Sequence, residues 1–237
     1  MLTRTTVPMR CKHITSLTGG LFDRFSPEAL EDLSSILHPI QHAAGVILFA
    51  EREEANHVFV ILEGEVKLSM NSSDGRRLIL RIARKGEIIG VTSVVARELH
   101  QTTAETLYPA KVALVPRAEF LAFLGRHIDV SQVVMQDLGH QFTMACEQLR
   151  TVGLSGSAPE KLARLLLDWS EHGQTNESGT HFRFSLTHGE IGEFIGTSRE
   201  TVTRTLSSFK HRRLVDFHGS MLTIRNKTAL ESFARAD

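Results

Sequence analysis

The stretch LTHGEIGEFIGTSRETVTRTL, residues 186–206, decides the fold of the C-terminal part of this 237-residue chain. Residues 187–190 have a Thr-x-x-Glu pattern, in which the Thr hydroxyl and the Glu carboxylate accept free backbone N–H groups at the start of a helix. Gly196 predicts the end of that helix, and a second helix begins at Thr197 or Ser198 and continues to about residue 212. Two short helices joined by a tight glycine turn are typical of a helix-turn-helix.

The two predicted helices have one apolar and one charged face. The packed inner face is formed by Ile191, Ile195, Val202 and Leu206. The opposite face of the second helix presents Arg199, Glu200, Thr203 and Arg204, which lie at positions i, i+1, i+4 and i+5. Arginine can donate two hydrogen bonds to guanine, and glutamate can accept one from cytosine. The alternative is a solvated face with a local Glu–Arg pair, but the order of capping box, turn and charged face favours base recognition.

The segments on either side complete a winged helix-turn-helix. Downstream, residues 214–217 and 221–224 predict a small hairpin across His218-Gly219-Ser220. Upstream, residues 159–171 predict a helix and residues 173–179 a polar loop, followed by an alternating strand at residues 181–186. The glycines, serines and proline of residues 153–159 predict a hinge before this domain.

Residues 118 to about 153 contain no proline and predict a helix, with Gly125 and Gly139 as weak points. Apolar side chains recur in it at spacings of 3 and 4, at Met135, Leu138, Phe142, Ala145, Leu149 and Val152. This 3.5-residue period favours a dimer helix. The alternative is an ordinary amphipathic helix that packs on its own domain.

The N-terminal half is rich in short β-branched runs separated by glycine and Asp-Gly turns. Strands are predicted at residues 46–49, 57–62, 65–68 and 78–82, with a further pair at 102–107 and 111–115. This spacing is typical of an antiparallel sandwich or barrel. Before it, Ser26-Pro27-Glu28 predicts a helix start, with serine as N-cap and proline at the first position.

Composition excludes several classes of protein. No apolar run is long enough to span a bilayer, and the N-terminus lacks the apolar stretch of a signal peptide, so we expect a cytoplasmic location. Enzyme motifs such as Gly-x-Ser-x-Gly, the P-loop and His-Glu-x-x-His are missing, so we do not expect an enzyme. The 27 basic and 27 acidic residues give no net charge, which at first argues against nucleic acid. However, residues 199–213 hold five basic side chains and one acidic side chain, a local excess that suits DNA phosphates.

Residues 190–204, together with Gly45-Val46-Ile47-Leu48-Phe49 and residues 60–68, resemble the CRP/FNR transcription regulators, the cyclic AMP receptor protein and its oxygen-sensing relatives. The resemblance covers roughly residues 20–230. It implies an α+β chain with an N-terminal antiparallel β-roll of the cyclic-nucleotide-binding jelly-roll type (1–125), a dimerisation helix and hinge (126–157) and a C-terminal winged helix-turn-helix (158–237).

The resemblance also implies roles for particular residues. Arg199, Glu200 and Arg204 match the base-reading positions, with Thr203 on the same face, and DNA backbone contacts would come from Thr187, His188, Thr197 and Ser198. The implied partners are palindromic double-stranded DNA with half-sites related to TGTGA or TTGAT, a second copy of the chain and RNA polymerase. A membrane is not among them.

The predicted effector region departs from the cyclic AMP-binding pattern. It comprises Gly86, Glu87, Ile88, Ile89, Gly90, Val91, Gln101, Thr102 and Cys146. Val91 stands where the ribose-binding glutamate would be, Gln101-Thr102 replaces the phosphate-binding Arg-Ser pair, and Cys146-Glu147 replaces the adenine-contacting Thr-Ser pair. We therefore do not expect cyclic AMP to bind, and the sequence leaves the effector unidentified.

Other cofactors are constrained by the histidines and cysteines. Two cysteines, Cys11 and Cys146, are too few for an iron–sulfur cluster. Twelve histidines leave haem as an alternative to surface and capping roles, although no metal site is predicted: Pro39 disfavours a helix that would align His38 with His42, and Cys11-Lys12-His13 lies in a polar terminus. Cys146 is either a small buried hydrophobe or a redox-sensitive thiol. A winged helix used only as a protein-binding surface is a further alternative.

Overall fold

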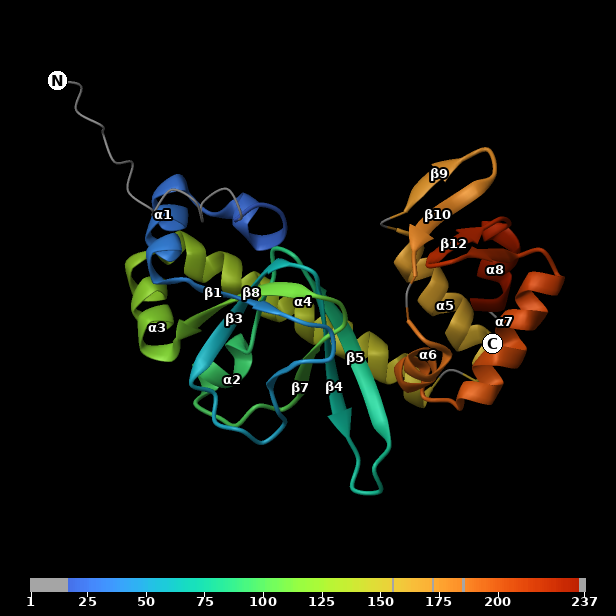
Figure 1. Cartoon of the computed structure of the whole chain (residues 1–237), viewed down its shortest axis with the longest axis horizontal. Coiled ribbons are helices and arrows are strands. Elements are labelled where there is room, and N and C mark those ends of the chain that lie inside the picture. Colours follow the sequence, from blue (N-terminus) through green and yellow to red (C-terminus); the bar gives the residue numbers. More distant parts are fainter. Residues whose placement is uncertain (1–16, 155, 172, 185, 235–237) are drawn as a thin grey trace. The chain divides into compact units, whose positions relative to one another are not determined.

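The computed structural model describes residues 17–154, 156–171, 173–184 and 186–234. The chain divides into two compact units (Figure 1). The first contains Met1–Met70 and Leu80–Thr143, and the second contains Asn71–Ile79 and Met144–Asp237. The tip of one hairpin in the N-terminal half therefore belongs to the same unit as the C-terminal domain.

The first unit contains a β-roll of two four-stranded antiparallel sheets. The first sheet has the order β1-β8-β3-β6 and the second has the order β2-β7-β4-β5. The strands are β1 (His38–His42), β2 (Ile47–Phe49), β3 (His57–Glu63), β4 (Glu65–Asn71), β5 (Arg77–Arg84), β6 (Ile88–Ile89), β7 (Thr103–Thr106) and β8 (Ala110–Pro116). The predicted antiparallel roll is confirmed.

Apart from β4 and β5, which lie in the same sheet, successive strands alternate between the two sheets. Only Gly64 separates β3 from β4, yet the two strands belong to different sheets. Its φ of 88° suits glycine, and a Cβ there would lie 2.8 Å from the Ala110 Cβ. The last two strands, which the sequence suggested as a pair, do not pair with each other: β7 pairs with β2 and β4, and β8 pairs with β1 and β3.

Two apolar cores hold the roll together. One lies between the sheets and includes Phe49, Phe59, Ile61, Leu68 and Val112. The other joins the β1-β8-β3-β6 sheet to a 3-10 helix (Gly20–Arg24) and to the helices α1 (Pro27–Ile36), α2 (Val91–Ala96), α3 (Arg117–Arg126) and the start of α4. Each fully buried large side chain contributes about 1.5–3 kcal/mol. Ser26 caps α1 as predicted, accepting from the Ala29 N–H.

Two elements of this unit differ from the sequence prediction. The helix expected from residue 118 is two helices, because His127 has an extended backbone and separates α3 from α4 (Ile128–Gly153). The break falls two residues after Gly125, whereas Gly139 remains helical. In addition, residues 38–42 form β1, which sequence patterns did not predict because Pro39 argues against a strand interior; β1 is an edge strand, where proline is tolerated.

The second unit is a winged helix-turn-helix. It contains α5 (Ala158–Ser170), α6 (His188–Ile195), α7 (Arg199–His211) and α8 (Lys227–Ala234) around a four-stranded sheet of order β11-β12-β10-β9. Those strands are β9 (Gln174–Asn176), β10 (Gly179–Arg183), β11 (Val215–His218) and β12 (Met221–Ile224). The predicted α5, α6, α7 and β11–β12 hairpin are confirmed. The segment expected as a polar loop contains β9, and α8 had no predicted counterpart.

Candidate nucleic-acid interface

Local sequence signals build the helix-turn-helix. Thr187 and Glu190 form the complete capping box of α6. The helix ends at Gly196, which has the left-handed backbone that glycine adopts without strain. Ser198 then caps α7 by accepting from the Thr201 N–H at 3.2 Å. Gly192 is also required, since a Cβ there would lie 2.7 Å from the Thr197 carbonyl oxygen.

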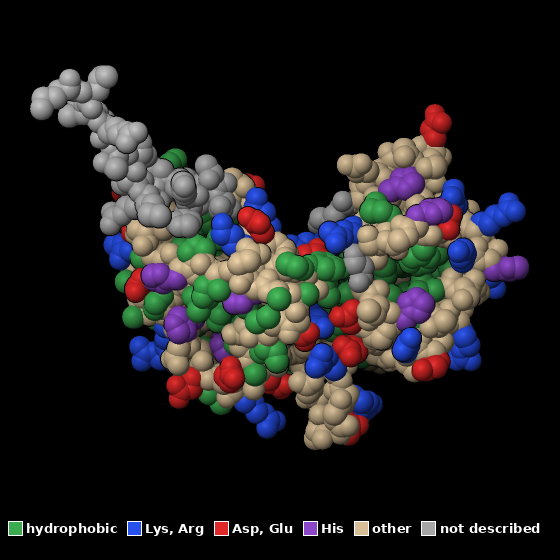
Figure 2. All heavy atoms as spheres, in the orientation of Figure 1, with side chains coloured by type: hydrophobic (Ala, Val, Ile, Leu, Met, Phe, Trp, Pro, Cys, Tyr) green, Lys and Arg blue, Asp and Glu red, His purple; other side chains and the backbone are tan. Residues whose placement is uncertain are grey.

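The predicted inner and outer faces of the two helices are separated in the structure. Ile191, Ile195, Val202 and Leu206 are all buried. The four predicted base-reading residues Arg199, Glu200, Thr203 and Arg204 are all exposed on α7. Figure 2 shows several basic side chains over the region of this helix. The apolar face thus anchors α7 while its charged face meets solvent.

Two charged side chains on the exposed face of α7, Arg204 and Glu200, can make further hydrogen bonds to a partner. The Arg204 guanidinium makes one long hydrogen bond, 3.3 Å, to the Thr201 hydroxyl. At the helix start, the backbone N–H of Glu200 and the Ser198 hydroxyl hold the pKa of Glu200 below its ordinary value. Glu200 therefore remains an ionised acceptor, suited to a cytosine amino group.

His188 and Thr203 are brought together across the turn. The Thr203 hydroxyl donates to the Arg199 carbonyl at 2.9 Å, and it lies 2.9 Å from Nδ1 of His188. Because its hydroxyl proton is used inside α7, Thr203 accepts from His188 Nδ1–H, and its side chain is exposed. A methyl group is a suitable partner for the thymine methyl.

The residues predicted to contact phosphates differ in their availability. Both donors of Thr187 go to the Glu190 carboxylate, at 3.0 Å from its N–H and 2.9 Å from its hydroxyl. The Ser198 hydroxyl is shared with Thr201. The Thr197 hydroxyl has no hydrogen-bond partner in the described part of the chain, so among these side chains it is the most readily available to a phosphate.

The predicted effector region does not form one lined pocket of free side chains. Ile88 and Ile89 form β6 and point into the two different cores, and Val91 is also a core residue. The backbone at Gly86 lies close to the backbone at Gly19, and a Cβ on Gly86 would lie 2.4 Å from the Gly19 carbonyl oxygen. Gly90 precedes α2 with a left-handed backbone.

The polar members of this region have partners or are dispersed. Glu87 pairs with Arg81 of β5, and its other oxygen accepts from the Arg84 N–H at 2.8 Å. Gln101 is exposed and donates to the Leu99 carbonyl at 3.1 Å, whereas Thr102 is half-buried. Cys146 is a half-buried free thiol that belongs to the second unit, whereas the other members of the set belong to the first.

Sequence patterns missed Arg81 and Asp137, which join Glu87 in a partly buried charged cluster. Desolvation raises the pKa of Asp137, while the Gln141 amide and Arg81 oppose that shift. The only sequence sign was a charged residue interrupting the apolar strand LILRIA at residues 78–83. Because Arg81 is paired with Glu87 within this cluster, it is not free to bind a phosphate.

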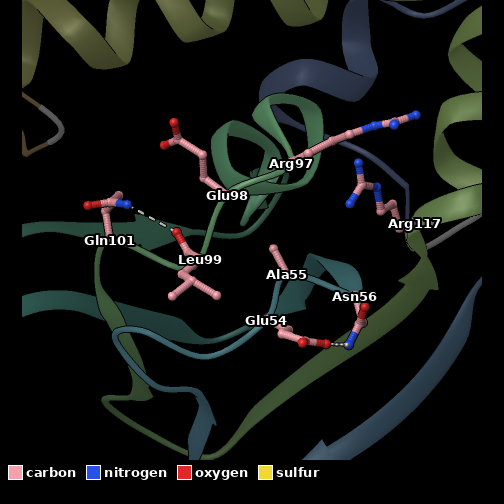
Figure 3. Close-up of a pocket in the computed structure, with 8 residues that line it drawn as sticks. All are labelled: Glu54, Ala55, Asn56, Arg97, Glu98, Leu99, Gln101 and Arg117. Atoms are coloured by element: carbon pink, nitrogen blue, oxygen red, sulfur yellow. Dashed lines mark hydrogen bonds between the residues drawn. The ribbon is translucent and has the colours of Figure 1, made fainter.

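A cavity of about 660 Å³ opens elsewhere on the first unit (Figure 3). It is lined by Glu54, Ala55, Asn56, Arg97, Glu98, Leu99, Gln101 and Arg117. Arg97 and Arg117 lie at one end, and Gln101 lies at the other. Two glutamates accompany the two arginines, so the lining carries no net charge that would select an anion. Of the predicted effector residues, only Gln101 lines this cavity.

The proposed seam on α4 is partly exposed. Ile128, Met135, Phe142 and Leu149 follow one another at intervals of seven and are 72%, 61%, 72% and 65% exposed. Leu138 is partly buried against the core of its own chain, and Ala145 and Val152 are half-buried. The sequence prediction did not include Ile128, although it continues the same heptad spacing.

Among the described residues, no group of three His, Cys, Asp or Glu side chains could hold a metal ion, and no helix is long and apolar enough to cross a membrane. His38 and His42 lie on β1. The Cys11-Lys12-His13 segment lies outside the described residues.

Comparison with known proteins follows the division into two units. Residues 39–127 match the cyclic nucleotide-binding domain, and residues 160–233 match the Crp-like helix-turn-helix domain. A CRP-like cAMP-activated global transcriptional regulator of Mycobacterium tuberculosis is 25% identical over 92% of this chain and 97% of its own length. A global nitrogen regulator of Synechococcus elongatus is 24% identical over 80% of this chain and 86% of its own.

The solved structure of FixK2 from Bradyrhizobium japonicum has the same fold, with a TM-score of 0.76 and 23% identity over 85% of this chain and 99% of that one. The fold, the recognition helix and these matches define a transcription regulator that binds DNA through its helix-turn-helix, and not an enzyme. The chain belongs to the CRP/FNR family.

Proposed function

We propose that this regulator binds a two-fold symmetric DNA operator as a homodimer, with one α7 helix in each major groove. The exposed face of α7 carries this proposal, because Arg199, Glu200 and Arg204 are exposed on a helix whose other face is buried. Half-sites related to TGTGA or TTGAT are the first candidates. Contacts to the DNA phosphates would hold α7 in position, and they would come from Thr197, Ser198, His188 and the backbone near Thr187.

The exposed stripe on α4 supports a homodimer. Four large apolar side chains at heptad spacing, Ile128, Met135, Phe142 and Leu149, form a seam that a second copy of the helix can bury. Burying such side chains contributes about 1.5–3 kcal/mol each. In a dimer the basic α7 helices are presented twice, which compensates for the zero net charge of the chain.

The effector in this proposal is not cyclic AMP. Val91 is a core residue, Gln101 donates to the Leu99 carbonyl, and Arg81 is paired with Glu87. Three alternatives for the control of the protein follow: haem bound to it, oxidation of a thiol, or DNA binding without a small-molecule effector. An absorption spectrum of the purified protein separates them: a Soret band demonstrates haem, whereas a colourless protein that cyclic AMP does not bind favours the others. RNA polymerase is the expected protein partner at the promoter.

The test of DNA binding starts with selection of duplexes from a random pool by the full-length protein. We expect an enriched palindrome with half-sites about one helical turn apart. Phe142→Asp should convert the dimer to a monomer in sedimentation and weaken operator binding by about 100-fold or more, because each half-site contact is then made alone. The matched control is Gln132→Asp, an exposed position on the same helix. A pool without enrichment, or a Phe142→Asp dimer of unchanged affinity, contradicts the proposal.

A further inference from the structure

Gln148 is a buried polar residue in the C-terminal half of α4. Its side chain is 8% exposed in a helix whose neighbouring positions Glu147 and Leu149 face solvent. The side-chain amide Nε2 donates to two backbone carbonyls, that of Ile79 in β5 at 3.0 Å and that of Phe194 in α6 at 2.6 Å. An amide NH2 has two protons, so this one group is fully used by two segments that are distant in sequence.

A second contact lies one helical turn further along the same face of α4. A Cβ on Gly196 would lie 2.9 Å from Cγ1 of Val152, so the turn between α6 and α7 packs directly on that side chain. The Val152 carbonyl in turn accepts from the Lys161 Nζ of α5 at 2.8 Å. Positions 148 and 152 of α4 therefore hold the last turn of α6 and the glycine that follows it.

These contacts connect the helix-turn-helix to the C-terminal part of α4, from Met144 onward, which belongs to the same compact unit. The recognition helix begins three residues after Gly196, and both Val202 on its inner face and Ile195 of α6 are buried. Fixing the end of α6 on α4 consequently fixes α7 as well. The arrangement leaves Arg199, Glu200 and Arg204 exposed, so the contact does not cover the DNA-reading face.

The third segment at this contact is the β4–β5 hairpin. Ile79 is two residues from Arg81 in the same strand, and Arg81 pairs with Glu87 of the predicted effector region. Gln148 thus contacts both the helix-turn-helix and the strand that carries this ion pair. A shift of β5 along its axis would break or reorient the hydrogen bond at Ile79.

We propose that Gln148 is a positioning residue for DNA recognition: it joins β5 to α6 on the dimer helix and thereby sets the separation of the two recognition helices. This inference rests on the proposed homodimeric operator binding. In such a dimer the two-fold axis runs between the paired α4 helices. The two α7 helices fit the two half-sites only when each has a fixed direction from that axis, so that they lie about 34 Å apart, one turn of DNA.

The experiment uses the full chain and the palindrome selected by the wild-type protein, rebuilt with one and two base pairs added to or removed from its centre. Gln148→Met keeps the length of the side chain and removes both donors, so it leaves two buried carbonyls unpaired. We expect affinity for the optimal spacing to fall about tenfold, and the preference for that spacing over its neighbours to be lost. Affinity for random duplex should be unchanged.

Controls separate positioning from folding. Gln132→Met makes the same replacement at an exposed position of α4 and should retain the wild-type spacing profile. Thermal unfolding of each variant shows whether the fold is retained. Should Gln148→Met fail to fold, Val152→Ala loosens the second contact with a smaller loss of packing, and it should broaden the spacing profile in the same direction.

Each outcome decides between the two proposals. A wild-type protein that selects no palindrome contradicts the proposed function itself. A wild-type protein with a spacing preference that a folded Gln148→Met retains unchanged overturns the positioning role and leaves the proposed function standing. Tighter binding by Gln148→Met at every spacing also overturns it, since the contact would then restrain α7 in a direction unsuited to DNA.

Discussion

The recognition helix α7 and the predicted effector region differ in what their polar side chains do. On α7, Arg199, Glu200 and Arg204 are exposed to solvent. In the effector region, Glu87 is paired with Arg81, and Ile88 and Ile89 fill the cores. Free side chains on a rigid element signal a partner outside the chain, whereas self-satisfied ones signal internal structure. The comparison explains why DNA binding follows from this chain and the effector does not.

The largest expected effect would test the α7 side of this comparison. Arg204→Ala should weaken operator binding because each lost bidentate base contact costs about 1–3 kcal/mol, and a dimer loses it twice. That corresponds to at least about 25-fold in Kd, measured by gel shift at fixed salt. Discrimination at one base position of each half-site should relax as well. The exposed Lys210→Ala serves as a control for charge alone, and equal losses for both variants would contradict base reading by Arg204.

A smaller effect is expected on the effector side. Arg81→Ala removes the partner of the partly buried Glu87 carboxylate and should reduce the free energy of unfolding by about 1–3 kcal/mol. Because the pair is internal, the double variant Arg81→Ala/Glu87→Gln should recover part of that loss. Urea unfolding monitored by circular dichroism measures both. If neither substitution changes stability, the pair is not the internal structure that the comparison assumes.

The smallest expected effect concerns a carboxylate that belongs to neither region. Desolvation and the nearby Glu171 and Glu147 raise the pKa of Asp168 to about 6. Since the folded-state pKa lies above the unfolded value near 3.8, the folded state binds this proton more tightly, and wild-type stability decreases as pH rises from about 4 to about 6. Asp168→Asn should therefore raise Tm by a few degrees at pH 8.

The pH dependence provides the check on that substitution. Below about pH 4 the wild-type Asp168 carboxyl is protonated in the folded and unfolded states, so it is uncharged like the amide of the Asp168→Asn variant. The difference in Tm between the two proteins should therefore disappear. Operator affinity should not change at either pH, because Asp168 lies on α5 away from the exposed face of α7. A Tm difference that persists at pH 4 would mean that packing, not ionisation, causes the effect.

How much of the structure was predictable varied with the range of the interactions. The capping box of α6, its end at Gly196 and the start of α7 at Ser198 depend on residues within four positions of one another, and all three predictions are confirmed. The break at His127 and strand β1 were missed, because sequence periodicity does not show which neighbour a short segment meets. The half-buried Leu138, Ala145 and Val152, which alternate with exposed residues of the predicted seam, were not foreseen for the same reason.

By itself the sequence determined the helix-turn-helix, the β-rich character of the first half and the charged face of α7. These follow from local hydrogen bonds, from backbone preferences of glycine and proline, and from the spacing of apolar residues. Only the tertiary structure decided the assignment of β7 and β8 to different sheets, the pairing of Arg81 with Glu87 and the two hydrogen bonds of Gln148. Those contacts join residues from 6 positions apart, for Arg81 and Glu87, to 76 positions apart, for His38 and Leu114, and they form only when separate elements bury their apolar faces together.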